Sequence, residues 1–172
     1  LNNHCHFSLL ERYVNQSNKL DWVLATIVNK VGSSYRSAGA IMLINSLGQS
    51  YGLVSGGCLE ANIVLHAKKV FDSQQAQYIE YDMREEDGYA AELGVGCKGK
   101  IGVLLQYITP AHQSVLAHLF QRMQLGETSY LQQVFATEPS SAELLNGLTL
   151  FDDNGQFLVS TKQNQEESTL TR

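Results

Sequence analysis

The chain has 172 residues, of which 44% are hydrophobic and 17% are charged, and its formal net charge is −5. This length suits one domain with an ordinary core, and the composition is typical of globular proteins rather than disordered or fibrous ones. The acidic balance and scattered basic residues argue against nucleic-acid binding, and no segment approaches the roughly 20 apolar residues of a membrane span.

Apolar residues recur at helical spacing over residues 6–18, which predicts an amphipathic first helix. Residues 22–31 are rich in β-branched side chains and predict a buried strand. The next two predicted strands, 40–44 and 50–54, flank the turn residues 45–48 and indicate a hairpin.

The second half of the chain alternates further helices and strands. The predicted helices cover residues 59–71 and 111–124, and the predicted strands cover 77–83, 101–108, 130–136 and 148–159, the last being a hairpin turned at Asn154-Gly155. Strict βαβ alternation is missing, so we expect antiparallel hairpins beside one or two crossovers. The predicted fold class is α/β or α+β, a mixed sheet with antiparallel hairpins and flanking helices in a single domain.

Three cysteines at irregular spacing, without a CxxC pair, argue against a secreted disulfide framework and a structural zinc site, so we expect a cytoplasmic protein. A polar run follows residue 160, which suggests a domain over 1–160 and a tail or linker over 161–172. The alternative is the frayed end of a complete protein.

Ser55-Gly56-Gly57-Cys58 lies where a predicted strand gives way to a helix. Backbone N–H groups without intrahelical partners converge at such a turn, and glycines let an anionic ligand approach them. A thiol in the first helical turn is stabilised as the thiolate, so Cys58 suits a nucleophile, a soft metal ligand or a persulfide carrier. The alternative is structural: Ser55 caps the helix and Cys58 packs in the core.

A second glycine-rich cluster surrounds Cys97, from Gly94 to Lys100, and leads into a predicted strand. Its glycines admit a close ligand, and its two lysines favour a phosphate or pterin-type anion. The alternative is a glycine-rich bulge with solvated lysines.

The loop over residues 32–39 places Ser33, Ser34 and Arg36 between two glycines. The planar guanidinium of Arg36 suits a phosphate or carboxylate group. A solvated surface turn is the alternative.

Three motifs together resemble the N-terminal domain of the XdhC/CoxI family, the xanthine dehydrogenase accessory factors. They are W-V-L-A-T-I-V-x-x-x-G-S-S-x-R-x-x-G-A, Y-G-L-V-S-G-G-C-L-E and L-G-V-G-C-x-G, within about residues 20–108. Two positions depart from the family pattern: Tyr35 replaces a usual proline, and Lys98 replaces a frequent glycine.

The resemblance implies a cytoplasmic accessory protein that binds the molybdenum cofactor, a molybdopterin, and assists its sulfuration with a cysteine desulfurase. The protein would then deliver the cofactor to an apo molybdenum hydroxylase. It also implies a C-terminal Rossmann-type domain after the linker, which would carry any nucleotide site, and a homodimer is expected by family habit.

Cys58 and Cys97 are the predicted reactive thiols, which approach the molybdenum or carry sulfur. The predicted cofactor contacts are Ser33, Arg36, Gly39, Ser55, Gly56, Gly57, Cys58, Glu60, Gly96, Cys97 and Gly99. An accessory protein is favoured over a stand-alone enzyme. Two alternatives stay open: a thiol-dependent transferase or oxidoreductase that uses Cys58, and a docking module without ligand chemistry.

Overall fold

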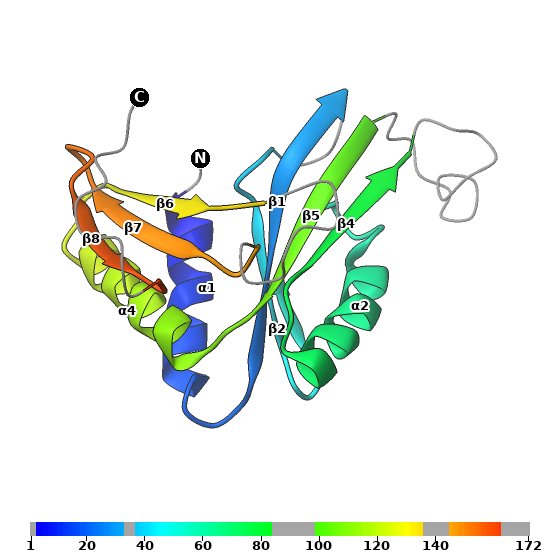
Figure 1. Cartoon of the computed structure of the whole chain (residues 1–172), viewed down its shortest axis with the longest axis horizontal. Helices are drawn as coiled ribbons and strands as arrows, with labels where there is room; N and C mark the ends of the chain where they lie inside the picture. The colour runs from blue at the N-terminus through cyan, green and yellow to red at the C-terminus, as the bar shows by residue number, and fades with distance from the viewer. Residues whose placement is uncertain (1–2, 33–36, 84–98, 136–144, 163–172) are drawn as a thin grey trace.

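A computed structural model describes residues 3–32, 37–83, 99–135 and 145–162 of the chain. Its elements, in chain order, are α1 (Asn3–Gln16), β1 (Trp22–Gly32), β2 (Ile41–Asn45), β3 (Ser50–Gly52), α2 (Glu60–Ser73), β4 (Gln77–Asp82), β5 (Gly99–Tyr107), α4 (Pro110–Gln124), β6 (Ser129–Gln133), β7 (Leu148–Asp152) and β8 (Phe157–Ser160). Figure 1 shows a larger sheet with α2 on one side, and with α1, α4 and a smaller sheet on the other.

The larger sheet has five strands in the order β3-β2-β1-β5-β4, and each neighbouring pair is antiparallel. Successive residues of a strand point to opposite faces. Val23 and Ile27 of β1 join the core under α2, whereas Trp22 and Leu24 join the core under α1 and α4. Because both faces are covered there, residues 22–27 of β1 are buried, as the sequence predicted, whereas residues 30–32 at its end are exposed.

The smaller sheet, in the order β6-β7-β8, is also antiparallel. Leu148 and Leu150 of β7 share one hydrophobic cluster with Leu116 of α4 and Trp22 of β1. The two sheets therefore meet through a common core.

A buried polar bridge also joins the two sheets. Gln133 of β6 donates from Nε2 to Gln106 Oε1 at 2.8 Å and to Thr26 Oγ1 at 3.0 Å. Gln106, which is fully buried in β5, donates in turn to the carbonyl of Leu145 at 2.8 Å. Every partner in this bridge is itself hydrogen-bonded, which a buried polar group requires.

The predicted α/β or α+β class is confirmed. The predicted mixed sheet is corrected: the described strands form two sheets whose pairs are all antiparallel, because β3 and β4, which α2 connects, lie at opposite sides of the larger sheet and do not pair. Several predicted boundaries shift: α1 covers 3–16 rather than 6–18, and β6 ends at Gln133 rather than at 136. β3 ends at Gly52, two residues before the predicted end, because Gly52 takes a φ of +92° that ends the extended conformation.

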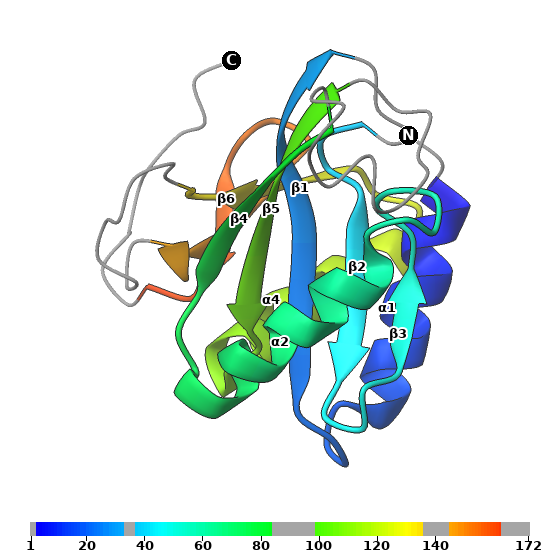
Figure 2. The ribbon, with the colours of Figure 1, turned by 90° about the vertical axis from the view of Figure 1, so that its right-hand side faces the viewer.

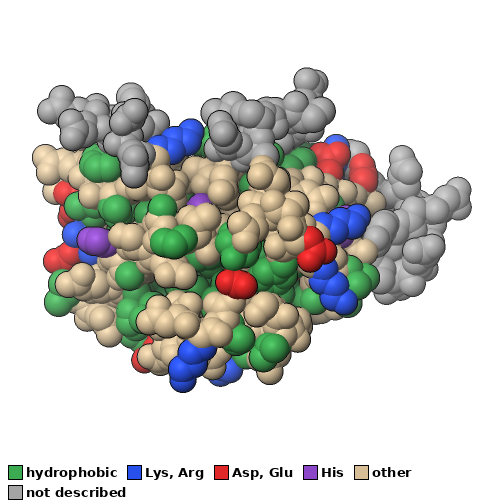
Figure 3. Space-filling view, turned by 60° about the horizontal axis from the view of Figure 1, so that its bottom comes forward, with side chains coloured by type: hydrophobic (Ala, Val, Ile, Leu, Met, Phe, Trp, Pro, Cys, Tyr) green, Lys and Arg blue, Asp and Glu red, His purple; other side chains and the backbone are tan. Residues whose placement is uncertain are grey.

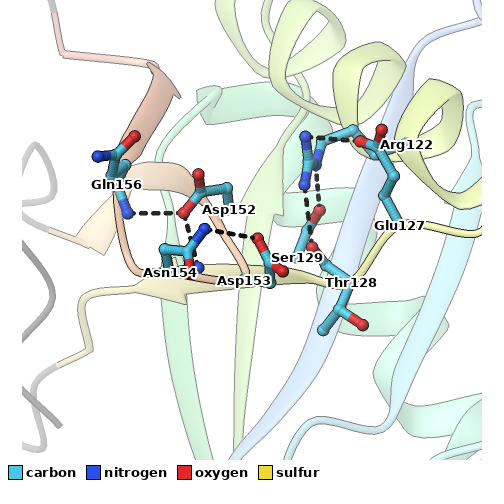
Figure 4. Close-up of polar contacts among 8 residues, drawn as sticks. All are labelled: Arg122, Glu127, Thr128, Ser129, Asp152, Asp153, Asn154 and Gln156. Atoms are coloured by element: carbon cyan, nitrogen blue, oxygen red, sulfur yellow. Dashed lines mark hydrogen bonds and ion pairs between the residues drawn. The ribbon is translucent and has the colours of Figure 1, made fainter.

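The predicted turn at Asn154-Gly155 is confirmed. Asp152 accepts hydrogen bonds at one carboxylate oxygen from the N–H groups of Asn154, at 2.9 Å, and Gln156, at 2.8 Å (Figure 4).

In the same view, Arg122 of α4 pairs with Glu127 at 2.7 Å and donates from Nε to Ser129 Oγ at 2.6 Å. These contacts fix the start of β6 against the end of α4.

His112 of α4 is buried and bonded at both ring nitrogens. Its Nε2 lies 2.9 Å from the carbonyl of Asn146, which only accepts, so Nε2 carries the proton. Its Nδ1 lies 2.8 Å from Thr109 Oγ1 and completes the capping box that begins α4. Burial lowers the pKa of His112, although the Asn146 carbonyl partly opposes this shift.

Stability is expected to fall as the pH drops below about 6.5, the ordinary histidine value. In the unfolded chain His112 takes up a proton below this pH, whereas in the folded chain its pKa is lower and it stays neutral. The stability that comes from the neutral, buried His112 is therefore fully present above pH 6.5 and is lost as the pH falls. Within this window the slope is up to about 1.4 kcal/mol per pH unit. The free energy of unfolding, measured with urea at several pH values between 7.5 and 5.5, should change less with pH in His112→Gln than in the wild type. The exposed His118 on the same helix provides the control, since His118→Gln should keep the wild-type slope.

Charged side chains are dispersed over the face shown in Figure 3, where lysines and arginines lie in separate groups among acidic and polar residues. Among the described residues, the structure has no helix with the length and apolar character that a membrane crossing needs.

Candidate functional site

Three connections begin at one edge of the larger sheet, where β1, β3 and β4 end. They are the β1–β2 connection over 33–40, the β3–α2 connection over 53–59, and the β4–β5 connection over 83–98. The antiparallel order explains this arrangement, because β1, β3 and β4 run toward this edge and β2 and β5 leave from it. Figure 2 shows β2 and β5 running opposite to β3. We call this edge the site edge.

The residues that flank these connections share one hydrophobic cluster. Ala40 ends the first connection, Val54 and Leu59 lie in the second, and Met83 begins the third, and all four are buried in the core under α2. Cys58, which is half-buried, packs against the same cluster. The site edge therefore has a common apolar floor.

The predicted cofactor contacts fall on these three connections or on the residues next to them. Ser33, Arg36, Gly96 and Cys97 lie outside the described residues. The remaining ones, Gly39, Ser55, Gly56, Gly57, Cys58, Glu60 and Gly99, are placed by the structure at or near the site edge.

Gly56 and Gly57 are exposed and take φ values of +79° and +114°, which favour glycine. A Cβ at Gly57 would meet no atom of the described residues within 4 Å, so the backbone conformation rather than packing explains why this position is glycine. The backbone beside Cys58 is therefore open to a ligand.

Glu60 turns its carboxylate back onto the connection that precedes α2. Oε1 accepts from the N–H groups of Val54 at 3.0 Å and Ser55 at 2.8 Å, and Oε2 accepts from Ser55 Oγ at 2.6 Å. The same hydroxyl accepts from the N–H of Leu59 at 2.8 Å. Burial raises the pKa of Glu60, but the hydrogen bonds from Ser55, from its own N–H and from Val54 outweigh it and hold the pKa below its usual value.

The prediction that Cys58 lies in the first helical turn is wrong. Helix α2 begins at Glu60 and its N-cap is Leu59, so Cys58 precedes the helix. The shift has a physical cause: Glu60 and Ser55 tie residues 54–59 into a closed turn before the helical hydrogen bonds start. The dipole effect falls off within the first turn and acts less directly on this thiol.

Gly39 and Gly99 lie at the same edge but in different settings. Gly39 takes a φ of +88°, has open space around its Cα, and donates its N–H to the carbonyl of Ile27 at 2.8 Å. Gly99 is buried opposite Gly32 and accepts at its carbonyl from the N–H of Met83 at 2.9 Å. Gly99 therefore supports the sheet, while Gly39 leaves its backbone accessible.

Sequence reasoning missed a hydrogen bond between β4 and α2 close to the site edge. Tyr81 of β4 donates its hydroxyl to Asn62 Oδ1 of α2 at 2.8 Å, two residues before buried Met83. It also missed the internal role of Glu60. The available signal was a serine five residues before a helix-opening acid, a wider version of the capping-box spacing.

Within the described part of the chain, no group of three or more His, Cys, Asp or Glu side chains is arranged to hold a metal ion. The described residues define a class of domain: two antiparallel sheets in which β1, β3 and β4 end at one edge of the larger sheet over an apolar floor, and in which the β3–α2 connection carries a cysteine between two glycines and a helix.

Comparison with known proteins gives the family. The model of the XdhC and CoxI family matches residues 16–82. A crystal structure of a xanthine dehydrogenase from Bacillus halodurans has the same fold, with a TM-score of 0.75 and 27% identity over 95% of this chain and 46% of that one. The family prediction is confirmed: residues 16–82 belong to the XdhC and CoxI family.

Two relatives match with higher sequence identity. A probable xanthine dehydrogenase subunit of Bacillus subtilis (strain 168) is 45% identical over 87 residues, 51% of this chain and 26% of that protein. The molybdenum cofactor insertion chaperone PaoD of Escherichia coli (strain K12) is 32% identical over 106 residues, 60% of this chain and 32% of that protein. The chain thus spans about a quarter to a third of the length of these relatives.

Proposed function

We propose that this chain belongs to an accessory protein that binds the molybdenum cofactor and inserts it into a xanthine dehydrogenase-type molybdenum hydroxylase. The observation that carries the proposal is the site edge, where Cys58 follows the exposed Gly56 and Gly57 over a shared apolar floor. The match to a molybdenum cofactor insertion chaperone supports it.

The residues at the site edge fit this cargo. A thiol is a soft ligand for a transition metal, and glycine backbone without a Cβ nearby lets a bulky pterin approach. In this proposal Cys58 contacts the molybdenum, Gly39, Gly56 and Gly57 line the approach, and Arg36 binds the phosphate. Cys97 stays a predicted second thiol.

The proposal includes assistance in sulfuration. A cysteine desulfurase supplies sulfur as a persulfide, which a thiol reductant converts to sulfide with two electrons. The sulfide replaces an oxo ligand of molybdenum, and the oxo oxygen leaves as water with two protons. The chain holds the cofactor during this exchange.

The partners in this proposal are the desulfurase and the apo-hydroxylase. A homodimer, a cytoplasmic location, and a separate domain after residue 160 with its own nucleotide site stay predictions.

Replacing Cys58 with serine is expected to lower cofactor retention about tenfold or more, because changes even behind a metal ligand cost about 10–100-fold in metal affinity. The chain would be mixed with cofactor released from a molybdenum hydroxylase, desalted and oxidised, and the retained pterin measured by fluorescence. Cys5→Ser, in α1, is the matched control and should retain as much as the wild type.

Equal retention in Cys58→Ser and the wild type would remove the thiol from the proposal. Absence of retention in the wild type would contradict cofactor binding by this chain. Turnover of a thiol-dependent substrate by the chain alone would favour an enzyme instead.

A further inference from the structure

We propose that Glu60 is a positioning residue, which holds residues 54–59 in the shape that presents Cys58 and does not itself touch the cofactor. This inference rests on the proposed function, since it assigns the support of the same site. In this inference Glu60 and Ser55, which the sequence predicted as cofactor contacts, support the turn that carries the contacts.

The hydrogen bonds of Glu60 reach both ends of the turn. Its carboxylate holds Val54 and Ser55 at the beginning, and through the Ser55 hydroxyl it holds Leu59 at the end. Gly56, Gly57 and Cys58 lie between these anchors. A turn with two glycines loses much conformational entropy when it is ordered, so such anchors are needed to keep it in one shape.

The anchor itself is firmly placed. Glu60 is the first residue of α2, and the helix packs into the core through Ile63, Ala67 and Val70. Hydrogen bonds to a charged carboxylate are stronger than those between neutral groups. The turn is therefore fixed to a rigid helix rather than left to its own backbone.

The arrangement also changes where an anionic group of the ligand can bind. The N–H groups of Val54 and Ser55 already donate to a carboxylate, so the anion-binding corner predicted from the sequence is filled from within at these two positions. A phosphate there would meet a like charge. We therefore expect the phosphate of the cofactor away from Val54 and Ser55, which leaves the turn to Cys58 and the glycines.

Hydrogen exchange and cofactor retention test this inference on the full chain. In Glu60→Gln, the amides of Val54 and Ser55 should exchange at least about tenfold faster, because a charge-assisted acceptor is lost. Retained pterin should fall about tenfold or more in the same variant. Asp72→Asn makes the same acid-to-amide change at an exposed position of α2 and should alter neither measurement.

The serine provides a second pair of variants in case Glu60→Gln fails to fold. Ser55→Ala should speed exchange at Leu59 and lower retention, whereas Ser55→Thr keeps a hydroxyl and should restore both. Rescue by threonine would support positioning through the hydroxyl.

Two results would overturn the inference. Wild-type exchange with lost retention in Glu60→Gln would make Glu60 a direct cofactor contact, and faster exchange with full retention would show that the order of the turn is unimportant. Absence of retention in the wild type would instead contradict the proposed function, and the exchange measurements would still decide whether Glu60 orders the turn.

Discussion

Gly52→Ala is expected to destabilise the fold by about 3 kcal/mol, which would lower the melting temperature by roughly 6–12 °C for a chain of this size. Gly52 has a φ of +92°, a left-handed conformation that costs an L-residue about 1–2 kcal/mol. In addition, a Cβ would lie 2.6 Å from the carbonyl oxygen of Ile41 and 3.0 Å from Leu9 Cδ1. The strand pair β2–β3 would have to move apart at the site edge.

Gly48→Ala is the matched control for this prediction. Gly48 has a similar φ of +80°, but a Cβ there would meet nothing within 4 Å. The difference between the two variants in urea or thermal unfolding isolates the close contact from the backbone strain. Equal losses in both variants would show that Ile41 and Leu9 yield without cost and would contradict the packing argument.

Gln106→Leu is expected to cost about 2–4 kcal/mol of unfolding free energy, although leucine is apolar and similar in size. The substitution leaves the carbonyls of Leu145 and Gly147 without the Gln106 donor, and Gln133 without one of its two acceptors. A buried polar group that loses its partner costs about 1–3 kcal/mol. Chemical unfolding measured by circular dichroism would give the loss.

Gln132→Leu provides the control, because Gln132 is exposed on the adjacent position of β6 and should change stability by about 0.5 kcal/mol or less. The double variant Gln106→Leu with Gln133→Leu should recover part of the loss, since both members of one hydrogen bond are then removed. If Gln106→Leu is as stable as Gln132→Leu, the bridge between the two sheets contributes nothing to stability.

Much of the fold could be predicted from local pattern. The β-branched residues of 22–31 predicted β1, the apolar period of 111–124 predicted α4, and Asn154-Gly155 predicted the β7–β8 turn; each lies within one residue of its predicted place, although the end of β1 is exposed rather than buried. These features depend on the spacing of apolar residues and on the conformational preferences of single residues, both of which can be read from the sequence. The family resemblance likewise depended on local motifs, the first two of which lie within the matched residues 16–82.

The arrangement of the candidate site could not be predicted in the same way. Glycines and Cys58 were visible as a cluster, but the sequence favoured an open anion-binding corner and a thiol inside the helix. The structure places the Glu60 carboxylate at that corner and Cys58 before the helix. The direction of the Glu60 side chain decides which group occupies that corner, and the spacing of residues in the sequence does not predict this direction.

What the sequence by itself determined is therefore the set of elements, the positions of the turns, and the family of residues 16–82. Only the tertiary structure decided that Ala40, Val54, Leu59 and Met83, which lie in three separate connections, share one edge of the larger sheet and one apolar floor. The physical reason is that helix and strand signals are local, whereas strand order and the partners of Glu60 and Gln106 depend on contacts between segments distant in the chain.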